Sequence, residues 1–390
     1  MPNIPIENCT GCTACYSVCP CRAITMRPDA EGFSYPFVDN DVCVGCGLCE
    51  RVCPVIETPS LNGEYKAAFV ARSKEKEVIS ECTSGGFLDE LCRYVINELH
   101  GYAVGVAYDS EYMPYHKICT TYDEAIELRN SKYAQSELGD AFADIKRMLT
   151  ENKTVLFIGT PCQSAGLVSY IGKINAGELI TADLVCRSIP SRKLWKEHLS
   201  SLTDKYNSDI KSVACRRKTY GYHSGALEIE FENGKKYAAS NRTDTYMKSF
   251  HSDVCSRYSC YSCAFKTAHR CTDLTVFDCW DPEMVTGGAC IDDDRGYTSV
   301  IAHTERASEI IASMNRIEKY TADAEKMLGC TGGMATSSIQ LPKGRESYYA
   351  DVLEHGYLQG AAKHIRISAK DKVIEALKPL KYRIKLLLKK

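Results

Sequence analysis

The sequence predicts an α+β or α/β protein in which a small cysteine-rich domain precedes a larger, mixed α/β domain. Three observations predict this organisation. A run of four cysteines closed by proline occurs twice within the first 54 residues. From Tyr65 onward, short apolar segments alternate with segments of helical periodicity, as in an α/β sheet. The chain has 390 residues, of which 44% are hydrophobic, enough for two or three domains.

The two cysteine runs share one spacing, Cys-x2-Cys-x2-Cys-x3-Cys-Pro, with which bacterial ferredoxins hold 4Fe–4S clusters. Three thiolates two residues apart can face one cluster from a single loop. The fourth follows the start of a short helix and reaches the other cluster. The spacing therefore predicts a ferredoxin-like domain over residues 1–60 with two clusters and crossed ligands. These are Cys9, Cys12, Cys15 and Cys53 for the first cluster, and Cys43, Cys46, Cys49 and Cys19 for the second.

Other uses of cysteine fit this pattern less well. Zinc sites use paired Cys-x-x-Cys or Cys/His elements rather than two runs of four. A disulfide framework needs an oxidising compartment. A radical-forming cluster would need Cys-x3-Cys-x2-Cys, which the sequence lacks. The 22 cysteines are therefore expected to serve metal and redox chemistry.

Composition narrows the class further. A net charge of −2 argues against a nucleic-acid-binding protein, which would carry a basic excess. The N-terminus has no signal-peptide pattern, and no apolar run approaches the ~20 residues of a membrane span. We therefore expect a cytoplasmic protein, and the oxygen sensitivity of such clusters suggests an anaerobic host.

Beyond the turn at Asn62-Gly63, apolar or alternating segments predict strands, and apolar residues at helical spacing, such as Phe87, Leu91 and Val95, predict helices. The expected strands are 65–72, 102–108, 115–121, 153–159, 180–185, 210–216, 226–232, 274–277 and 297–302. The expected helices are 87–99, 123–128, 137–149, 164–171, 194–202, 243–250, a helix from residue 305, and 322–328. We divide this part into 64–150, 151–340 and a basic tail, 341–390.

Several residues in the larger domain are candidates for chemistry. Thr83-Ser84-Gly85-Gly86 precedes a helix whose expected N-cap is Ser84, an arrangement suited to a dinucleotide pyrophosphate or simply to a capped turn. Cys162 and Cys186 each follow a strand, where doubly wound sheets carry function, although buried cysteine also packs as a small apolar residue. Cys260 and Cys263 form a metal-ligand pair, to which Cys255 could add.

The tail is strongly basic. Residues 361–390 hold ten Lys or Arg against two acidic residues. Such a segment can lie on a membrane surface or an acidic partner, or remain a solvated terminus.

Five short motifs, in order and at compatible spacing over residues 1 to about 340, give the chain a family resemblance. They are Glu81-Cys-Thr-Ser-Gly-Gly86, Ser131-Lys-Tyr-Ala-Gln-Ser136, Gly159-Thr-Pro-Cys-Gln163, Asp183-Leu-Val-Cys186 and Ser259-Cys-Tyr-Ser-Cys-Ala-Phe265. The chain resembles the coenzyme F420 hydrogenase/dehydrogenase beta-subunit family, in the form with an N-terminal two-cluster ferredoxin.

The resemblance implies a flavin-binding domain with FAD and a third 4Fe–4S cluster. The implied ligands of that cluster are Cys162, Cys186, Cys260 and Cys263, with Cys255 and Cys271 in reserve. The implied flavin contacts are Thr83, Ser84, Gly85, Gly86, Asn130, Ser131, Lys132, Tyr133, Thr160, Pro161 and Gln163. Lys132 is our catalytic candidate, because its charge would stabilise an anionic reduced flavin, although a solvated loop is the alternative.

Two positions depart from the family pattern. Arg187-Ser188 follows Cys186 where the family usually has His-Gly, and Phe277-Asp278-Cys279 precedes Trp280 where it usually has Gly-Asp-Phe. These departures leave the substrate class open.

The main prediction is an iron–sulfur flavoprotein oxidoreductase that exchanges electrons with ferredoxin or another redox protein and acts on an organic small molecule. The alternatives are a beta subunit that exchanges hydride with a deazaflavin coenzyme in a larger complex, and an electron-relay module without a substrate site. The electron donor, the direction and the oligomeric state stay open.

Overall fold

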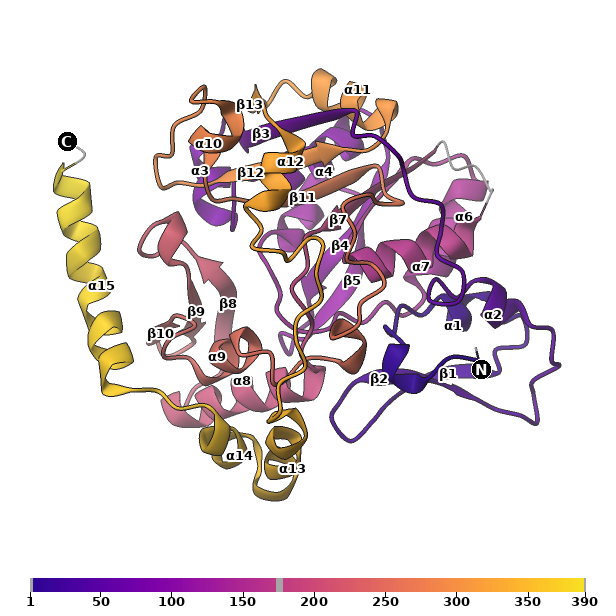
Figure 1. Ribbon diagram of the computed structural model, residues 1–390, viewed down its shortest axis with the longest axis horizontal. Coiled ribbons are helices and arrows are strands. Elements are labelled where there is room, and N and C mark those ends of the chain that lie inside the picture. The colour runs from indigo at the N-terminus through magenta and orange to yellow at the C-terminus, as the bar shows by residue number, and fades with distance from the viewer. Residues whose placement is uncertain (1–2, 173–177, 389–390) are drawn as a thin grey trace.

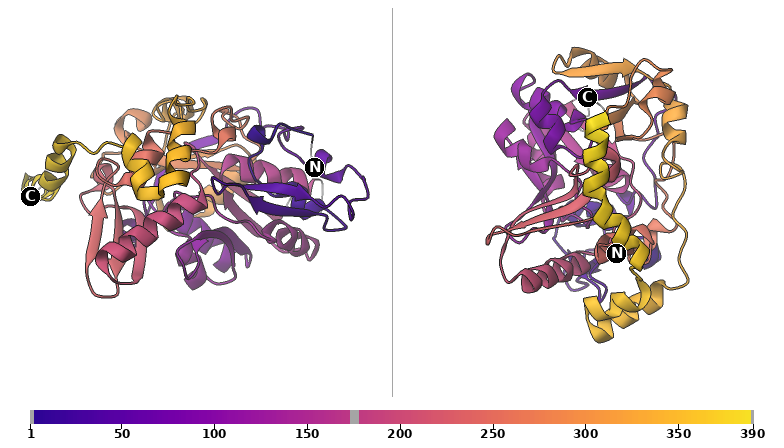
Figure 2. Two further views of the ribbon diagram at one scale, coloured as in Figure 1. Left: turned by 90° about the horizontal axis from the view of Figure 1, so that it is seen from below. Right: turned by 90° about the vertical axis from the view of Figure 1, so that its left-hand side faces the viewer.

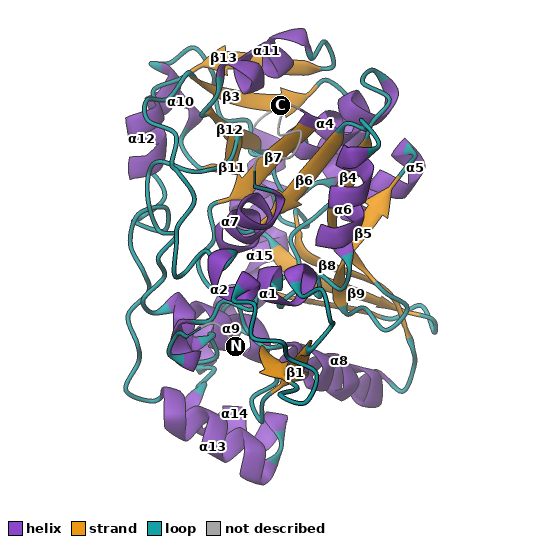
Figure 3. Cartoon of the chain, turned by 90° about the vertical axis from the view of Figure 1, so that its right-hand side faces the viewer, coloured by secondary structure: helices purple, strands orange, loops and turns teal. Residues whose placement is uncertain are grey.

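The computed structural model describes residues 3–172 and 178–388. Its centre is an eight-stranded mixed sheet in the order β13-β3-β12-β11-β7-β6-β4-β5. Strands β4, β6, β7 and β11 run parallel, so their carboxyl ends share one edge (Figure 3). The strands are β3 (Ala67–Ser73), β4 (Tyr102–Tyr108), β5 (Pro114–Cys119), β6 (Val155–Gly159), β7 (Leu179–Leu184), β11 (Leu274–Cys279), β12 (Tyr297–Ala302) and β13 (Ile317–Thr321).

Helices cover both faces of this sheet, because its strands are apolar on both sides. Phe87 and Leu91 of α4 and Ile311 of α11 are buried on one face, while Phe142 of α6 and Leu167 of α7 are buried on the other. The helices around the sheet are α3 (Lys76–Glu81), α4 (Phe87–Asn97), α5 (Tyr122–Ala125), α6 (Ala141–Thr150), α7 (Pro161–Ile171), α10 (Pro282–Thr286), α11 (Glu305–Ser313) and α12 (Ala324–Gly329).

A second, three-stranded antiparallel sheet follows, in the order β10-β9-β8. It packs with four helices around a separate apolar cluster that includes Trp195, Phe231 and Tyr246. Its elements are α8 (Arg192–Tyr206), β8 (Ile210–Arg217), β9 (Ala226–Phe231), β10 (Lys236–Ala239), α9 (Thr245–His251), α13 (Arg345–His355) and α14 (Tyr357–His364).

The N-terminal domain is small and lies at one end of the molecule (Figure 1). Its elements are η1 (Ile6–Asn8), α1 (Ala14–Val18), β1 (Ile24–Pro28), β2 (Ser34–Val38) and α2 (Leu48–Arg51). It has little core of its own beyond side chains such as Phe33 and Ile24. The mixed α/β class and the ferredoxin-type N-terminus agree with the prediction.

The predicted tail, 341–390, is wrong for its first part. Tyr348 and Tyr349 of α13 and Tyr357 of α14 are buried in the second apolar cluster. These aromatic residues give the segment 345–365 a core face that a count of charges does not reveal. Only the last helix, α15 (Ala369–Leu388), extends away from the body (Figure 2).

The expected strands and helices are present, with shifted ends. Helix α7 begins at Pro161 rather than Ser164, because Thr160 and Gln163 form a capping box. Helix α4 is capped by Gly86 in the left-handed conformation, so the expected N-cap at Ser84 is wrong. Strand β13 is absent from the prediction, since Ile317 is its one buried residue and the strand lies at the sheet edge. No helix within 3–172 or 178–388 is both long and apolar enough to cross a bilayer.

Candidate functional site

The first set of predicted cluster ligands meets in one cavity of the N-terminal domain. That cavity is lined by Cys9, Cys12 and Cys15 of the first run and by Cys53 of the second. Burial raises the pKa of the Cys15 thiol to about 12, and the neighbouring Cys9 and Cys53 thiolates add to the rise. The fourth thiol thus comes from the other run, as the crossed ligand prediction requires.

The second set lines a separate cavity with the same crossing. Its residues are Cys19 of the first run and Cys43, Cys46 and Cys49 of the second. Cys43 and Cys46 are exposed, whereas Cys12 of the first set is buried. The second set is therefore the outer one.

Left-handed residues shape both runs alike. Gly11 and Thr13 have φ of 69° and 64° in the first run, and Gly45 and Gly47 have 66° and 70° in the second. Thr13 and Gly47 are the N-caps of α1 and α2. A residue in the left-handed region reverses the chain locally, which lets successive thiols face one centre.

A third set of thiols meets in the main domain. Cys162 lies in the first turn of α7, Cys186 follows β7, and Cys260 and Cys263 lie in the loop before β11. Burial raises the pKa of Cys162 to about 12, with Cys263 and Cys186 adding to the rise. Burial likewise raises the pKa of Cys260, and its neighbours include the other three thiolates.

The reserve candidates lie elsewhere. Cys255 is buried in the second apolar cluster, where its carbonyl accepts a 2.8 Å hydrogen bond from the Tyr349 hydroxyl. Cys271 lies beside Asp183, whose charge adds to the raised pKa of that thiol. The structure therefore brings together the four thiols that the resemblance implied.

The spacing of these thiols differs from that of a mononuclear site. In the described part of the chain, no three His, Cys, Asp or Glu side chains converge closely enough to hold a single metal ion. A cubane distributes its four thiolates over four irons, so its ligands lie farther apart than those of one ion. All-thiol sets at this wider spacing fit 4Fe–4S clusters.

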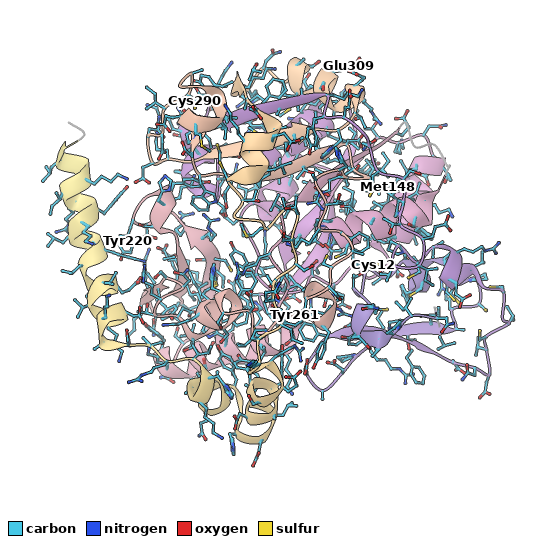
Figure 4. The ribbon with its side chains drawn as sticks, in the orientation of Figure 1. Cys12, Met148, Tyr220, Tyr261, Cys290 and Glu309 are labelled. Carbon is cyan, nitrogen blue, oxygen red and sulfur yellow. The ribbon has the colours of Figure 1, made fainter. Side chains whose placement is uncertain are left out.

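The first set lies against the third. Cys12 packs on α7, where a Cβ at Gly166 would lie 2.8 Å from Cys12 Sγ (Figure 4). The Cys162 thiolate contributes to the raised pKa of Cys12. The three sets therefore form a row from the exposed outer set, through the first set, to the buried third set.

The predicted flavin segments lie along one edge of the sheet. The Ser131 N–H donates to Thr83 Oγ1 at 3.2 Å, which joins two of them. Gln163 Nε2 donates to Ser136 Oγ at 3.0 Å, which joins the same loop to the third segment. The Thr160 hydroxyl lies 3.3 Å from Cys162 Sγ, so this edge reaches the third thiol set.

The Ser84-Gly85-Gly86 turn is engaged in packing. The Gly85 N–H donates to Thr298 Oγ1 at 3.0 Å, and the Ser84 hydroxyl donates to the Tyr297 carbonyl at 2.5 Å. A Cβ at Gly85 would lie 2.6 Å from the Ala71 carbonyl oxygen. These contacts explain the glycine without a phosphate, so they favour the capped-turn interpretation over the anion site.

Lys132 is partly buried above Tyr108, with Nζ 5.7 Å from the ring centre. Its ammonium donates to the carbonyls of Glu127 at 3.0 Å and Arg129 at 2.5 Å. Burial lowers its pKa to about 7. Its charge is therefore sensitive to pH near neutrality, and its catalytic role stays a prediction.

A cluster of cationic and aromatic side chains at the same edge is absent from the sequence-based prediction. Arg216, from the end of β8, forms an ion pair with Asp278 at the end of β11. The Tyr222 hydroxyl donates to Asp278 Oδ1 at 3.1 Å, and its ring stacks on Trp280 at 4.9 Å. Lys218 donates to the carbonyls of Ile79, Ser84 and Arg295. The run Arg216-Arg217-Lys218 was the available signal.

Both departures from the family pattern are occupied by ion pairs. Arg187 forms a bidentate pair with Asp253, with Nη2–Oδ2 at 2.7 Å and Nε–Oδ1 at 2.9 Å. Asp278 holds Arg216, as above. Each replacement therefore has a partner that stabilises it locally.

Comparisons with known proteins agree with this layout. Residues 152–326 match the family model for the C terminus of the coenzyme F420 hydrogenase/dehydrogenase beta subunit, and residues 8–56 match that of the 4Fe-4S dicluster domain. The coenzyme F420 hydrogenase subunit beta of Methanococcus voltae is 25% identical over 260 residues, which are 65% of this chain and 82% of that protein.

A chain in a solved structure of the F420-reducing NiFe hydrogenase complex from Methanosarcina barkeri is also similar. It has 16% sequence identity and a TM-score of 0.45, over 77% of this chain and 92% of that one. The family assignment rests on the two sequence matches. The chain therefore belongs to the coenzyme F420 hydrogenase/dehydrogenase beta-subunit family, as an electron-transfer oxidoreductase with a 4Fe–4S dicluster domain at its N-terminus.

Proposed function

We propose that this protein is a beta-type subunit that transfers electrons between a deazaflavin coenzyme of the F420 type and a redox partner protein. The observation that carries the proposal is the row of three thiol sets, which leads from an exposed surface to the cationic edge of the sheet. The name of the Methanococcus relative supports this alternative over our main prediction, a self-contained reductase of another organic substrate.

The twelve cysteines would hold three 4Fe–4S clusters, which carry single electrons. The outer set, with Cys43 and Cys46 exposed, would exchange electrons with the partner. The third set would serve the coenzyme, because the Thr160 hydroxyl links it to the sheet edge at 3.3 Å.

FAD is part of the proposal on chemical grounds. When bound, it would convert between the two electrons of a hydride and the single electrons of the clusters. The comparisons name no flavin. Lys132, Arg216 and Lys218 support an anionic ligand at this edge, since they bring positive charge to one place. The Trp280 side chain, 36% exposed, offers an aromatic surface for a ring.

The test begins with anaerobic purification and measurement of iron, sulfide and flavin on one sample. About twelve irons and one FAD per chain would support three clusters and a flavin. Coenzyme F420 and dithionite are then mixed with the protein, and loss of coenzyme absorbance is followed. We expect coenzyme reduction that Arg216→Gln slows at subsaturating coenzyme, with a matched Arg27→Gln control unchanged.

Two other outcomes separate the alternatives. About eight irons, no flavin and no reaction with F420 would favour the relay module and overturn the proposal. Bound flavin that is reoxidised by other organic acceptors, but not by F420, would favour the self-contained reductase. Copurification with a large redox partner would support the subunit role.

A further inference from the structure

Helix α15 exposes an apolar row on its outer side. The row consists of Val373, Leu377, Leu380, Ile384 and Leu387, whose spacings of four and three residues place them on one face of a helix. They are between 43% and 72% exposed. Five large apolar side chains in one exposed row form a surface that monomeric proteins rarely leave in water.

The opposite side of α15 faces the body and makes polar contacts instead. Glu375 accepts hydrogen bonds from the Ser240 hydroxyl and N–H, at 2.6 and 3.1 Å. Asp371 pairs with Lys248 at 2.9 Å, and Lys385 pairs with Asp294 at 2.8 Å. The helix is thus held by its polar face, and its apolar row is turned away from the protein.

Positive charge flanks the apolar row on both sides. At about 100° per residue, Lys370 and Lys381 lie on one flank, and Lys372 and Arg383 lie on the other. The two acidic residues of the helix, Asp371 and Glu375, are both used in contacts with the body. The outward charge of α15 is therefore positive along its whole length.

This arrangement selects one occupant. A second copy of the helix would bring like charges together at both flanks, which opposes self-association. An anionic lipid surface accepts the apolar row, while long Lys and Arg side chains extend to the headgroups. In Figure 2 the helix stands at the end of the molecule farthest from the N-terminal domain, so a flat surface could cover it and leave the outer thiol set free.

We propose that α15 binds this protein peripherally to anionic lipid membranes. The binding is independent of the proposed coenzyme. It would hold the protein at a membrane with the exposed Cys43 and Cys46 directed toward a redox partner in solution.

The experiment is vesicle co-sedimentation of the full-length, cluster-loaded protein. The vesicles contain phosphatidylcholine alone or phosphatidylcholine with phosphatidylglycerol. We expect binding to the anionic vesicles that weakens with salt. Leu380→Glu should weaken it by roughly tenfold or more, because a buried leucine is lost. Leu358→Glu, at a side chain 53% exposed against 56% for Leu380, is the matched control and should bind as the wild type does.

A second pair of variants tests the charge. Lys381→Gln combined with Arg383→Gln should weaken binding on the order of tenfold and reduce its salt dependence. Lys153→Gln combined with Lys235→Gln, both in exposed positions off the helix, should change neither. Unchanged iron content shows that each variant is folded.

Three results would overturn the proposal. One is absence of binding to anionic vesicles at low salt. Another is equal binding of Leu380→Glu and the wild type. The third is a dimer, or a complex with an acidic protein, that Leu380→Glu disrupts while no vesicle binding is seen, because the apolar row would then belong to a protein interface.

Discussion

The guanidinium of Arg257 donates a 2.7 Å hydrogen bond from Nε to the backbone carbonyl of Cys9. Arg257 is fully buried and comes from the loop that leads to Cys260. It also donates to the Ser34 carbonyl at 3.0 Å and lies 4.0 Å from the ring centre of Tyr35. One cation therefore joins the main domain to the N-terminal domain beside the first and third thiol sets.

Arg257→Gln should lower the reduction potential of the cluster predicted at the first set, on the order of tens of millivolts. A nearby positive charge favours the reduced, more negative cluster, and the amide lacks that charge. An anaerobic redox titration followed by electron paramagnetic resonance measures the shift. Arg345→Gln is the control, since Arg345 is also fully buried but pairs with Glu31. Equal potentials in the wild type and Arg257→Gln would refute the effect.

Cys260→Ser should remove about four irons per chain, because a cubane that loses one of its thiolates is destabilised. Iron and sulfide analysis of the purified protein checks this loss. Cys255→Ser replaces a buried thiol in the second apolar cluster and should leave the iron content unchanged. If the two results were exchanged, Cys255 would be the ligand and our assignment of the third set would be wrong.

Gly166→Ala should separate the first thiol set from the third. The added Cβ would lie 2.8 Å from Cys12 Sγ and 2.9 Å from its Cβ, so the N-terminal domain must shift. Electron transfer from the outer clusters to the third should slow, as rapid-mixing spectroscopy would detect. Gly329→Ala, which meets nothing within 4 Å, is the matched control. An unchanged rate in Gly166→Ala would mean that the domains accommodate the methyl group without separating.

Lys132 should make coenzyme reduction dependent on pH near neutrality. Its pKa is lowered to about 7, so the side chain is charged below that pH and neutral above it. If the charge stabilises an anionic reduced cofactor, the rate should fall as pH rises through about 7. Lys132→Arg keeps its charge and should flatten the profile, whereas Lys132→Met should be slow throughout. A wild-type rate that stays level between pH 6 and 9, a range of roughly three units around the shifted pKa, would remove this role.

The tertiary structure also explains a prediction that was weak. The motif Ser84-Gly85-Gly86 suggested a phosphate site, but Gly85 is small because the Ala71 carbonyl lies where its Cβ would be. A sequence shows that a position is glycine, but the neighbour that requires it can come from a distant strand. The cationic edge formed by Arg216 and Asp278 was missed for the same reason, since 62 residues separate them.

The sequence by itself determined the cysteine runs, their crossed grouping and most strands and helices. Those features depend on spacing over a few residues, on local periodicity and on capping, as in the Thr160–Gln163 box. Only the tertiary structure decided how the three thiol sets line up, that Arg257 lies between two of them, and which face of α15 is exposed. These relations depend on packing between segments far apart in the chain, and local sequence patterns carry no information about which distant surfaces meet.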